Sequence, residues 1–216
     1  MAAEHEWTLG ALPDYWARLT GCVHPDDEPT FNVETSHGFN LDFPPPAFVG
    51  DVVNAPVLIL DNNGGYRADL TPGEFRHPQA AGDMRERLKS PRSFDPRACG
   101  ASPYYSGRNF STWLSDGRAA LVNAVAYRSV DGAAPQVARL ARSLPSARYH
   151  REWLKHAVFP LVRLGQRFVV VHRWGRWGEA VNPLRGSQFA IFSRAPIGAD
   201  LTALEMEAAQ LFLNRS

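Results

Sequence analysis

Four consecutive apolar residues, Val57, Leu58, Ile59 and Leu60, constrain the fold of this chain more than any other feature. A strand that faces water on one side alternates apolar and polar residues, so an unbroken apolar run predicts a strand buried on both faces, as in a parallel sheet. The run is followed by the polar residues 61–66, Asp-Asn-Asn-Gly-Gly-Tyr. These residue types form turns, and they also supply chemistry at the carboxyl end of a parallel strand. Both interpretations end the strand at Leu60.

Strands and helices are predicted to alternate along the rest of the chain. The other predicted strands are 118–129, 167–175 and 187–196. Helical spacing marks segments within 9–20, 80–90, 109–117, 133–165 and 199–216. Thr202 and Glu205 have the spacing of a capping box at the start of the last helix. Residues 31–51, with three consecutive prolines at 44–46, are predicted to be irregular.

This order predicts an α/β fold with a mostly parallel, four-stranded central sheet. We expect a single domain over residues 1–216, with residues 1–43 as an N-terminal extension packed on it.

Composition and charge narrow the class of protein. No apolar run is long enough to span a membrane, and the N-terminus lacks the pattern of a secretory signal, so we expect a cytoplasmic protein with two free cysteines. Residues 1–83 carry 3 Lys/Arg against 13 Asp/Glu, whereas residues 84–194 carry 19 against 6. This Arg-rich centre permits nucleic-acid binding. The alternative is that the acidic and basic parts simply pack together and that Arg dominance reflects a GC-rich genome.

Polar side chains follow the predicted strands, at the sheet edge where ligands bind in an open parallel sheet. Asn123 is the most informative, because an amide inside the apolar segment 119–127 is costly to bury without partners and can read the edge of a base. The alternative for Asn123 is a structural amide, and for Asp61 a cap on backbone N–H groups. His172, Trp174 and Trp177 are typical of core packing, and the alternatives are a catalytic role for His172 and stacking on DNA for the two tryptophans. The sequence has no Cys/His grouping of a zinc site, no glycine-rich nucleotide fingerprint and no Gly-x-Ser-x-Gly motif, so we expect no metal and no cofactor.

Two short motifs resemble the uracil-DNA glycosylase superfamily. "LILDNNGGY" is similar to a Gly-x-Asn-Pro-Gly motif after the first strand, with Asn63 at the water-positioning Asn, and "AALVNAVAYRS" is similar to a Leu-Leu-Asn-x-Val strand, with Asn123 at the base-reading position. "VVVHRWGRWG" stands where the family has a glycine-containing turn, and "FSRAPIGADLT" stands where it has a His-Pro-Ser-Pro-Leu loop. The resemblance covers roughly residues 44–214 by element order and implies a three-layer sandwich.

The resemblance also implies roles for individual residues. Asn63, Asp61 and Arg194 would be catalytic, as water-positioning groups and as the group that stabilises the departing base. The expected substrate contacts are Asn123, Tyr66, Phe75, Gly65 and Ser193. The expected DNA contacts are Arg92, Arg97, Arg108, Arg173 and Arg176. The chain departs from the family at Gly64, where the motif has proline, and at the last loop, which lacks the histidine.

The function that the resemblance implies is hydrolysis of the N-glycosidic bond of uracil or another altered base in DNA. The expected partner is single-stranded or damaged duplex DNA, bound by a monomer, with no membrane contact. Two alternatives stay open. One is a weak or inactive nucleic-acid-binding member of the same fold, because the last-loop histidine is missing. The other is a hydrolase of small nucleotides or nucleosides.

Overall fold

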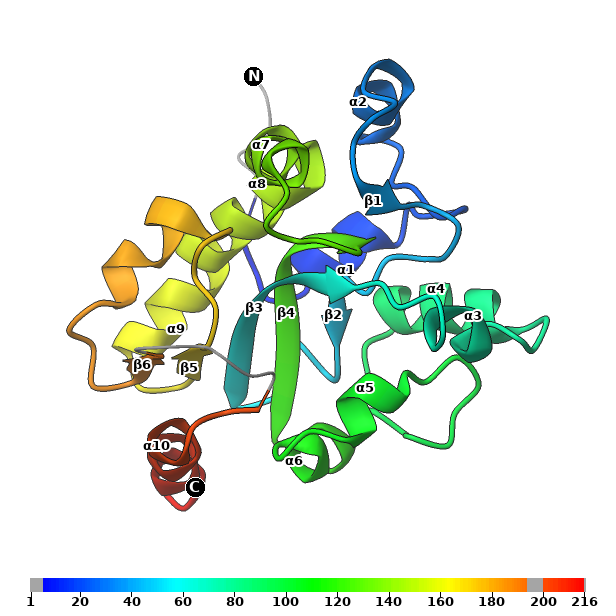
Figure 1. Ribbon diagram of the computed structural model, residues 1–216. Helices are drawn as coiled ribbons and strands as arrows, with labels where there is room; N and C mark the ends of the chain where they lie inside the picture. Colours follow the sequence, from blue (N-terminus) through cyan, green and yellow to red (C-terminus); the bar gives the residue numbers. More distant parts are fainter. Residues whose placement is uncertain (1–5, 194–199, 216) are drawn as a thin grey trace.

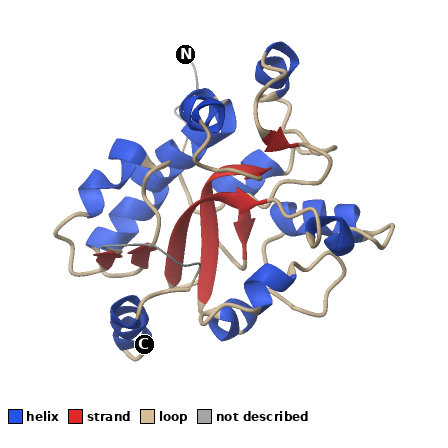
Figure 2. Ribbon diagram, in the orientation of Figure 1, coloured by secondary structure: helices blue, strands red, loops and turns tan. Residues whose placement is uncertain are grey.

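The computed structural model describes residues 6–193 and 200–215 and has a six-stranded sheet at its centre (Figures 1 and 2). Four strands run parallel in the order β4-β3-β5-β6, and two short strands, β1 and β2, pair antiparallel with β4. Their bounds are β1 Phe39–Asn40, β2 Phe48–Val49, β3 Val57–Gly65, β4 Ala119–Ser129, β5 Phe168–Val171 and β6 Ala190–Phe192. The predicted α/β class and the mostly parallel sheet are confirmed, whereas the predicted number of four strands is wrong, because β1 and β2 also pair with β4.

Helices cover both faces of the sheet. The first face packs against α1 (Ala11–Trp16), α8 (Pro145–Trp153), the π-helix Leu154–Val158, α9 (Phe159–Arg163) and the 3-10 helix Gly178–Leu184. The second face packs against α5 (Pro103–Ser106), α6 (Ser111–Ser115) and α10 (Ala203–Leu213). The other helices are α2 (Glu28–Val33), α3 (Thr71–Glu74), α4 (Ala80–Lys89) and α7 (Pro135–Ser143). Figure 1 shows the resulting layers of helix, sheet and helix.

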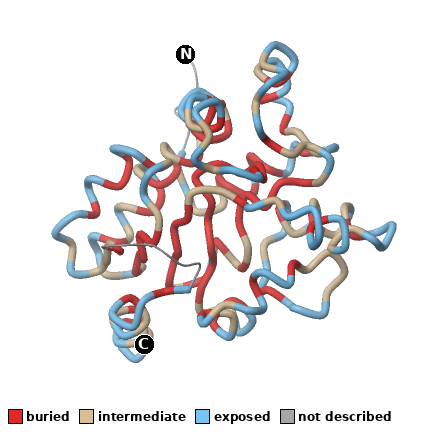
Figure 3. The backbone as a smooth tube through the Cα atoms, viewed as in Figure 1, coloured by how far each residue is buried: buried red, intermediate tan, exposed pale blue. Residues whose placement is uncertain are grey.

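Alternate residues of β3 enter the two cores, as the unbroken apolar run predicts. Leu58 and Leu60 join the core of the first face, whereas Val57 and Ile59 join the core of the second. All four side chains are fully buried, and Figure 3 shows the strands as the buried centre of the chain. The predicted capping box is confirmed, since Thr202 Oγ1 accepts a hydrogen bond from the Glu205 backbone N–H at 3.3 Å and Glu205 Oε2 accepts one from that of Thr202 at 2.7 Å.

Two local predictions are wrong, and the length of strand β4 explains both. The polar residues 61–65 do not form a turn but continue β3, because β4 extends far enough to pair Asn63 with Val125 and, after a shift in register, Gly65 with Ser129. Residues 31–51 are not wholly irregular either. Their strands β1 and β2 satisfy the outer edge of β4, on either side of the prolines at 44–46. An edge strand as long as β4 would otherwise leave backbone groups unpaired.

No helix in residues 6–193 and 200–215 is long and apolar enough to cross a membrane. Cys22 and Cys99 are both free thiols.

A buried histidine fixes the middle of β4 against α1 and α8. His150 Nδ1 lies 2.7 Å from the backbone oxygen of Asn123, and His150 Nε2 lies 2.8 Å from Trp16 Nε1, which donates to it. This arrangement requires the neutral imidazole with its proton on Nδ1, because Nε2 must accept. Burial lowers the pKa of His150 to about 4, well below the value of about 6.5 in an unfolded chain.

We expect the free energy of unfolding to fall by up to about 3 kcal/mol as the pH is lowered from about 6.5 to about 4. In this window the unfolded chain binds a proton at His150 and the folded protein does not, so acid favours unfolding. Urea titrations at a series of pH values measure the slope. His150→Gln should flatten it, while His156→Gln, a change at the exposed surface, should leave it as in the parent. An unchanged slope in His150→Gln would contradict this assignment.

Candidate functional site

A cavity of about 460 Å³ lies at the carboxyl ends of β3 and β4, and residues of α3 and α5 line it as well. The chain leaves β3 for β4 on one side and later crosses to β5 on the other, and this is the position where open parallel sheets bind ligands. The lining residues are Pro46, Asp61, Asn63, Gly64, Gly65, Arg67, Leu70, Thr71, Glu74, Ser102, Pro103, Tyr104, Tyr105, Arg108, Leu121, Asn123, Arg128, Ser129, Val130, Gly132 and Arg173. Four of the predicted site residues from β3 and β4 are among them.

Asp61 and Asn123 are neighbours across this cavity floor. Their Cα atoms are register partners in the parallel pair β3–β4, so both side chains leave the sheet on the same face. Asp61 is 5% exposed, and its Oδ1 accepts from the Asn62 backbone N–H at 2.7 Å and lies 3.5 Å from Arg173 Nε. Among the described residues no group pairs with Asp61 Oδ2. One carboxylate oxygen is therefore anchored and the other is left for a ligand.

Asn123 is held in place by the polyproline segment. Its Nδ2 donates to the backbone oxygen of Pro46 at 2.6 Å, and its backbone N–H donates to that of Ala47 at 3.0 Å. The side chain is almost fully buried, yet it lines the cavity. An amide has two N–H donors and one oxygen acceptor, so one N–H and Oδ1 stay available toward the cavity. The role of Pro46 gives the proline run a local function that composition alone did not reveal.

Asn63 also lines the cavity, but both of its amide donors are committed within the protein. Nδ2 donates to the Gly64 backbone oxygen at 2.9 Å and to Ser129 Oγ at 2.8 Å. Only Oδ1 is left, and a carboxamide oxygen is a poor general base. The neighbouring Gly64 is required by packing, because a Cβ there would lie 2.6 Å from Pro46 Cγ. Gly64 is buried and belongs to strand β3, at the shift in register between Asn63 and Gly65.

A buried ion pair forms one wall of the cavity. Arg128 Nη2 donates to Glu74 Oε2 at 2.9 Å, and the Arg128 and Glu74 side chains are only 4% and 6% exposed. Ser102 Oγ donates to Glu74 Oε1 at 2.6 Å, so both carboxylate oxygens of Glu74 are satisfied. Sequence reasoning missed this pair. The one available signal was an arginine at the end of the apolar strand 119–127.

The aromatic side chains of the cavity are Tyr104 and Tyr105, not the expected Tyr66 and Phe75. Phe75 stacks on Phe43 with ring centroids 4.8 Å apart and packs behind the ion pair. Tyr104 is 38% exposed, and the Arg108 guanidinium lies 4.8 Å from its ring centroid. Helix α5 brings its two tyrosines to the cavity from a segment about 40 residues after the first motif.

The five predicted DNA-binding arginines do not form one surface. Arg108 and Arg173 line the cavity, and Arg176 lies behind it against Gly132. The Arg97 side chain is almost fully exposed and lies beside Asp95. Arg92 lines a different pocket.

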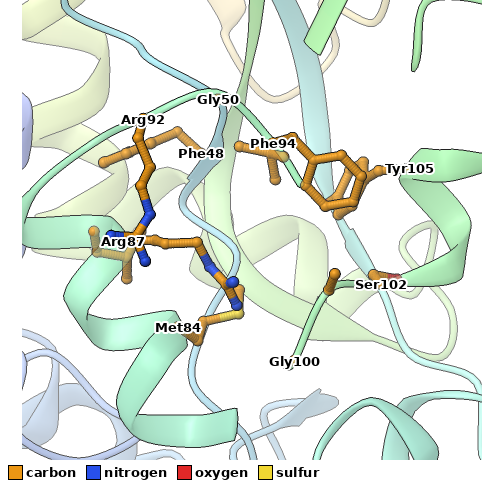
Figure 4. Close-up of a pocket in the computed structure, with 12 residues that line it drawn as sticks. Phe48, Gly50, Met84, Arg87, Arg92, Phe94, Gly100, Ser102 and Tyr105 are labelled. Carbon is orange, nitrogen blue, oxygen red and sulfur yellow. The ribbon is translucent and has the colours of Figure 1, made fainter. Parts of the chain in front are cut away.

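That second pocket is a closed, mostly apolar slot beside the cavity (Figure 4). Phe48, Met84 and Phe94 line it together with Arg87 and Arg92, and it shares Ser102 and Tyr105 with the cavity. Its open space is about 30 Å³, which is room for about one water molecule. Arg92 therefore lines this slot and not the candidate site.

Other predicted residues have simpler positions. Gly65 lines the cavity, whereas Ser193 is buried at the end of β6 and does not. Trp177 is fully buried and its Nε1 donates to the Asp61 backbone oxygen at 2.8 Å. His172 is buried with Nδ1 3.3 Å from Glu205 Oε1. Arg194 lies outside the described residues.

Within residues 6–193 and 200–215, no three His, Cys, Asp or Glu side chains are grouped as metal ligands. Comparisons with models of protein families, with curated proteins and with solved structures found no match to this chain.

Proposed function

We propose that this protein hydrolyses the N-glycosidic bond of an altered base, uracil in the first instance, in nucleic acid. The observation that carries the proposal is the pairing of Asp61 and Asn123 in one cavity. An amide with a free donor and a free acceptor suits the edge of a pyrimidine, and a carboxylate beside it suits activation of water. The resemblance of the two motifs to the uracil-DNA glycosylase superfamily supports the same reaction.

In the proposed reaction, Asn123 holds the edge of the extruded base and Tyr104 contacts its face. Asp61 Oδ2 takes a proton from water as the water oxygen bonds to the anomeric carbon of the sugar. The bond between that carbon and the base nitrogen breaks, its electron pair leaves with the base, and the base anion then takes a proton from solvent water. Arg194 is the proposed group for the negative charge of the departing base. Removing a base from the stack requires a pocket of this kind.

The mouth of the cavity favours a polymeric substrate over a free nucleoside. Arg67, Arg108 and Arg173 line the cavity together with two exposed apolar side chains, Leu70 and Val130. Each arginine lies beside a carboxylate, that of Asp69, Asp200 and Asp61 respectively, and a phosphate would compete with it. Arginines at the rim attract phosphates, and a partly exposed Tyr104 offers a stacking face. A small nucleoside would use neither group outside the cavity.

The test is release of a base from single-stranded DNA oligonucleotides that each carry one altered base. We expect an abasic product with uracil and none with the four normal bases, measured by strand cleavage after mild alkali. Release of base from free deoxyuridine, faster than from the oligonucleotide, would instead indicate a nucleoside hydrolase. Tight binding to the oligonucleotides without any abasic product would indicate a non-catalytic binder.

A further inference from the structure

A further cavity, distinct from the candidate site and from the apolar slot, is lined by basic residues. It has a volume of about 450 Å³ and opens between the end of α7, the start of the π-helix and the segment after β5. The basic residues that line it are Arg142, Arg151, Lys155 and Arg176, and one acidic residue, Glu179, lines it as well. We refer to this cavity as the basic basin.

The positive charge of the basic basin is largely uncompensated. In the part of the chain that the structure describes, Lys155 pairs with Glu152 at 2.7 Å, but Arg142, Arg151 and Arg176 make no ion pair with a carboxylate. Burial, and then the nearby Arg142 charge, lower the pKa of the Arg176 guanidinium. The four cations outnumber the two nearby carboxylates, Glu152 and Glu179, so they repel one another, and an anion relieves that repulsion.

Hydrogen bonds within the protein hold part of this arrangement together. Arg151 donates to the backbone oxygens of Ala141 and Arg142 at 3.1 and 2.8 Å, and to that of Arg176 at 3.5 Å. Arg151 thus fixes the end of α7 against the segment after β5. Arg151 and Arg176 are therefore held in place, whereas Arg142 and Lys155 are surface side chains at the edge of the basin.

Arg176 connects the basic basin to the candidate site. Its Nη2 donates to the Gly132 backbone oxygen, and its backbone N–H donates to Asn62 Oδ1 at 2.9 Å. Gly132 lines the cavity that contains Asp61 and Asn123, while Asn62 leaves β3 on the opposite face from Asp61. The basic basin and the candidate site are therefore separated by Arg176 and its two contacts, Asn62 and Gly132.

We propose that the basic basin binds a backbone phosphate of a single nucleic-acid strand, close to the nucleotide whose base enters the cavity. The identity of the polymer rests on the proposed function, whereas the phosphate site rests on the basin alone. A single nucleic-acid strand can place one phosphate in the basic basin and cross the few residues that separate the basin from the cavity. A membrane surface is flat and would meet the rim instead. Arginine forks in the basin suit phosphate oxygens.

The experiment measures binding to a labelled single-stranded 15-mer of normal bases by fluorescence anisotropy, at several salt concentrations. We expect Arg142→Gln and Lys155→Gln each to weaken binding about tenfold and to lower the slope of log affinity against log salt by about one. The matched control is Arg215→Gln, which removes the same charge from an exposed side chain outside both cavities and should change binding less than twofold. Inorganic pyrophosphate should displace the 15-mer from the parent and not from the Arg142→Gln, Lys155→Gln double variant.

Equal losses in all three single variants would overturn the proposal, because they would show binding through net charge rather than through the basin. Vesicles with phosphatidylserine supply the other class of partner. If Arg142→Gln weakens binding to vesicles and leaves binding to the 15-mer unchanged, the nucleic-acid assignment is wrong. None of these measurements needs base release, so a failure of the glycosylase proposal is separable from a failure of the phosphate site.

Discussion

Replacing Asp61 with asparagine is expected to lower the rate of uracil release by about 10² to 10⁴-fold, with little change in binding of the oligonucleotide. The substitution keeps the shape of the side chain, and an asparagine oxygen can still accept from the Asn62 N–H that now anchors Oδ1. What it removes is the proton acceptor at Oδ2. Single-turnover rates with saturating enzyme measure the chemical step apart from binding.

Asn63→Ala is the matched control for Asp61→Asn. Sequence resemblance places Asn63 at the water-positioning residue, whereas both of its amide donors are used inside the protein. We expect the Asn63 variant to lose less than tenfold in rate and some stability from the broken contact to Ser129. If Asn63→Ala loses far more than Asp61→Asn, with both proteins folded, the water is positioned by Asn63 and our assignment of the base is wrong.

We expect that the Asn123→Leu protein no longer distinguishes bases that differ at the edge that Asn123 contacts. The parent should release uracil at least about 10²-fold faster than 3-methyluracil, because methylation removes the N–H that Asn123 Oδ1 accepts and leaves a buried polar group unpaired. In Asn123→Leu the rate with uracil should fall to the rate with 3-methyluracil. The measurement is the ratio of the two single-turnover rates in the same DNA sequence.

A purely structural role for Asn123 makes a different prediction. Leucine leaves the Pro46 backbone oxygen without its donor, so some loss of stability, about 1–3 kcal/mol, is expected in either case. If Asn123 only braces Pro46, both rates fall together and their ratio is preserved. That result would mean that Asn123 does not recognise the base, and it would contradict the proposed function.

Several elements could be predicted from the sequence because local patterns determine them. The unbroken run 57–60 needs apolar surroundings on both faces, and a parallel sheet covered by helices provides them. The capping box at Thr202 and Glu205 needs only a few neighbouring residues, so its spacing was sufficient. Asn123 was also identifiable, because an amide in an apolar strand is costly unless it has partners or a ligand.

The end of β3 shows where local reasoning failed. Residues 61–65 have turn composition, but strand pairing with β4 outweighs that preference because the backbone hydrogen bonds of a ladder satisfy groups that a buried turn would leave unpaired. The same applies to Gly64, whose small size is required by Pro46 rather than by a turn.

The sequence by itself determined the fold class, the centre of the sheet and the two amino acids, Asp61 and Asn123, at its carboxyl edge. Only the tertiary structure decided which partners complete the cavity. Glu74, Tyr104 and Arg128 come from segments far apart in the chain and meet because α3 and α5 fold over the ends of β3 and β4. No local sequence pattern relates these three residues, because packing geometry, and not local propensity, decides which distant segments come into contact.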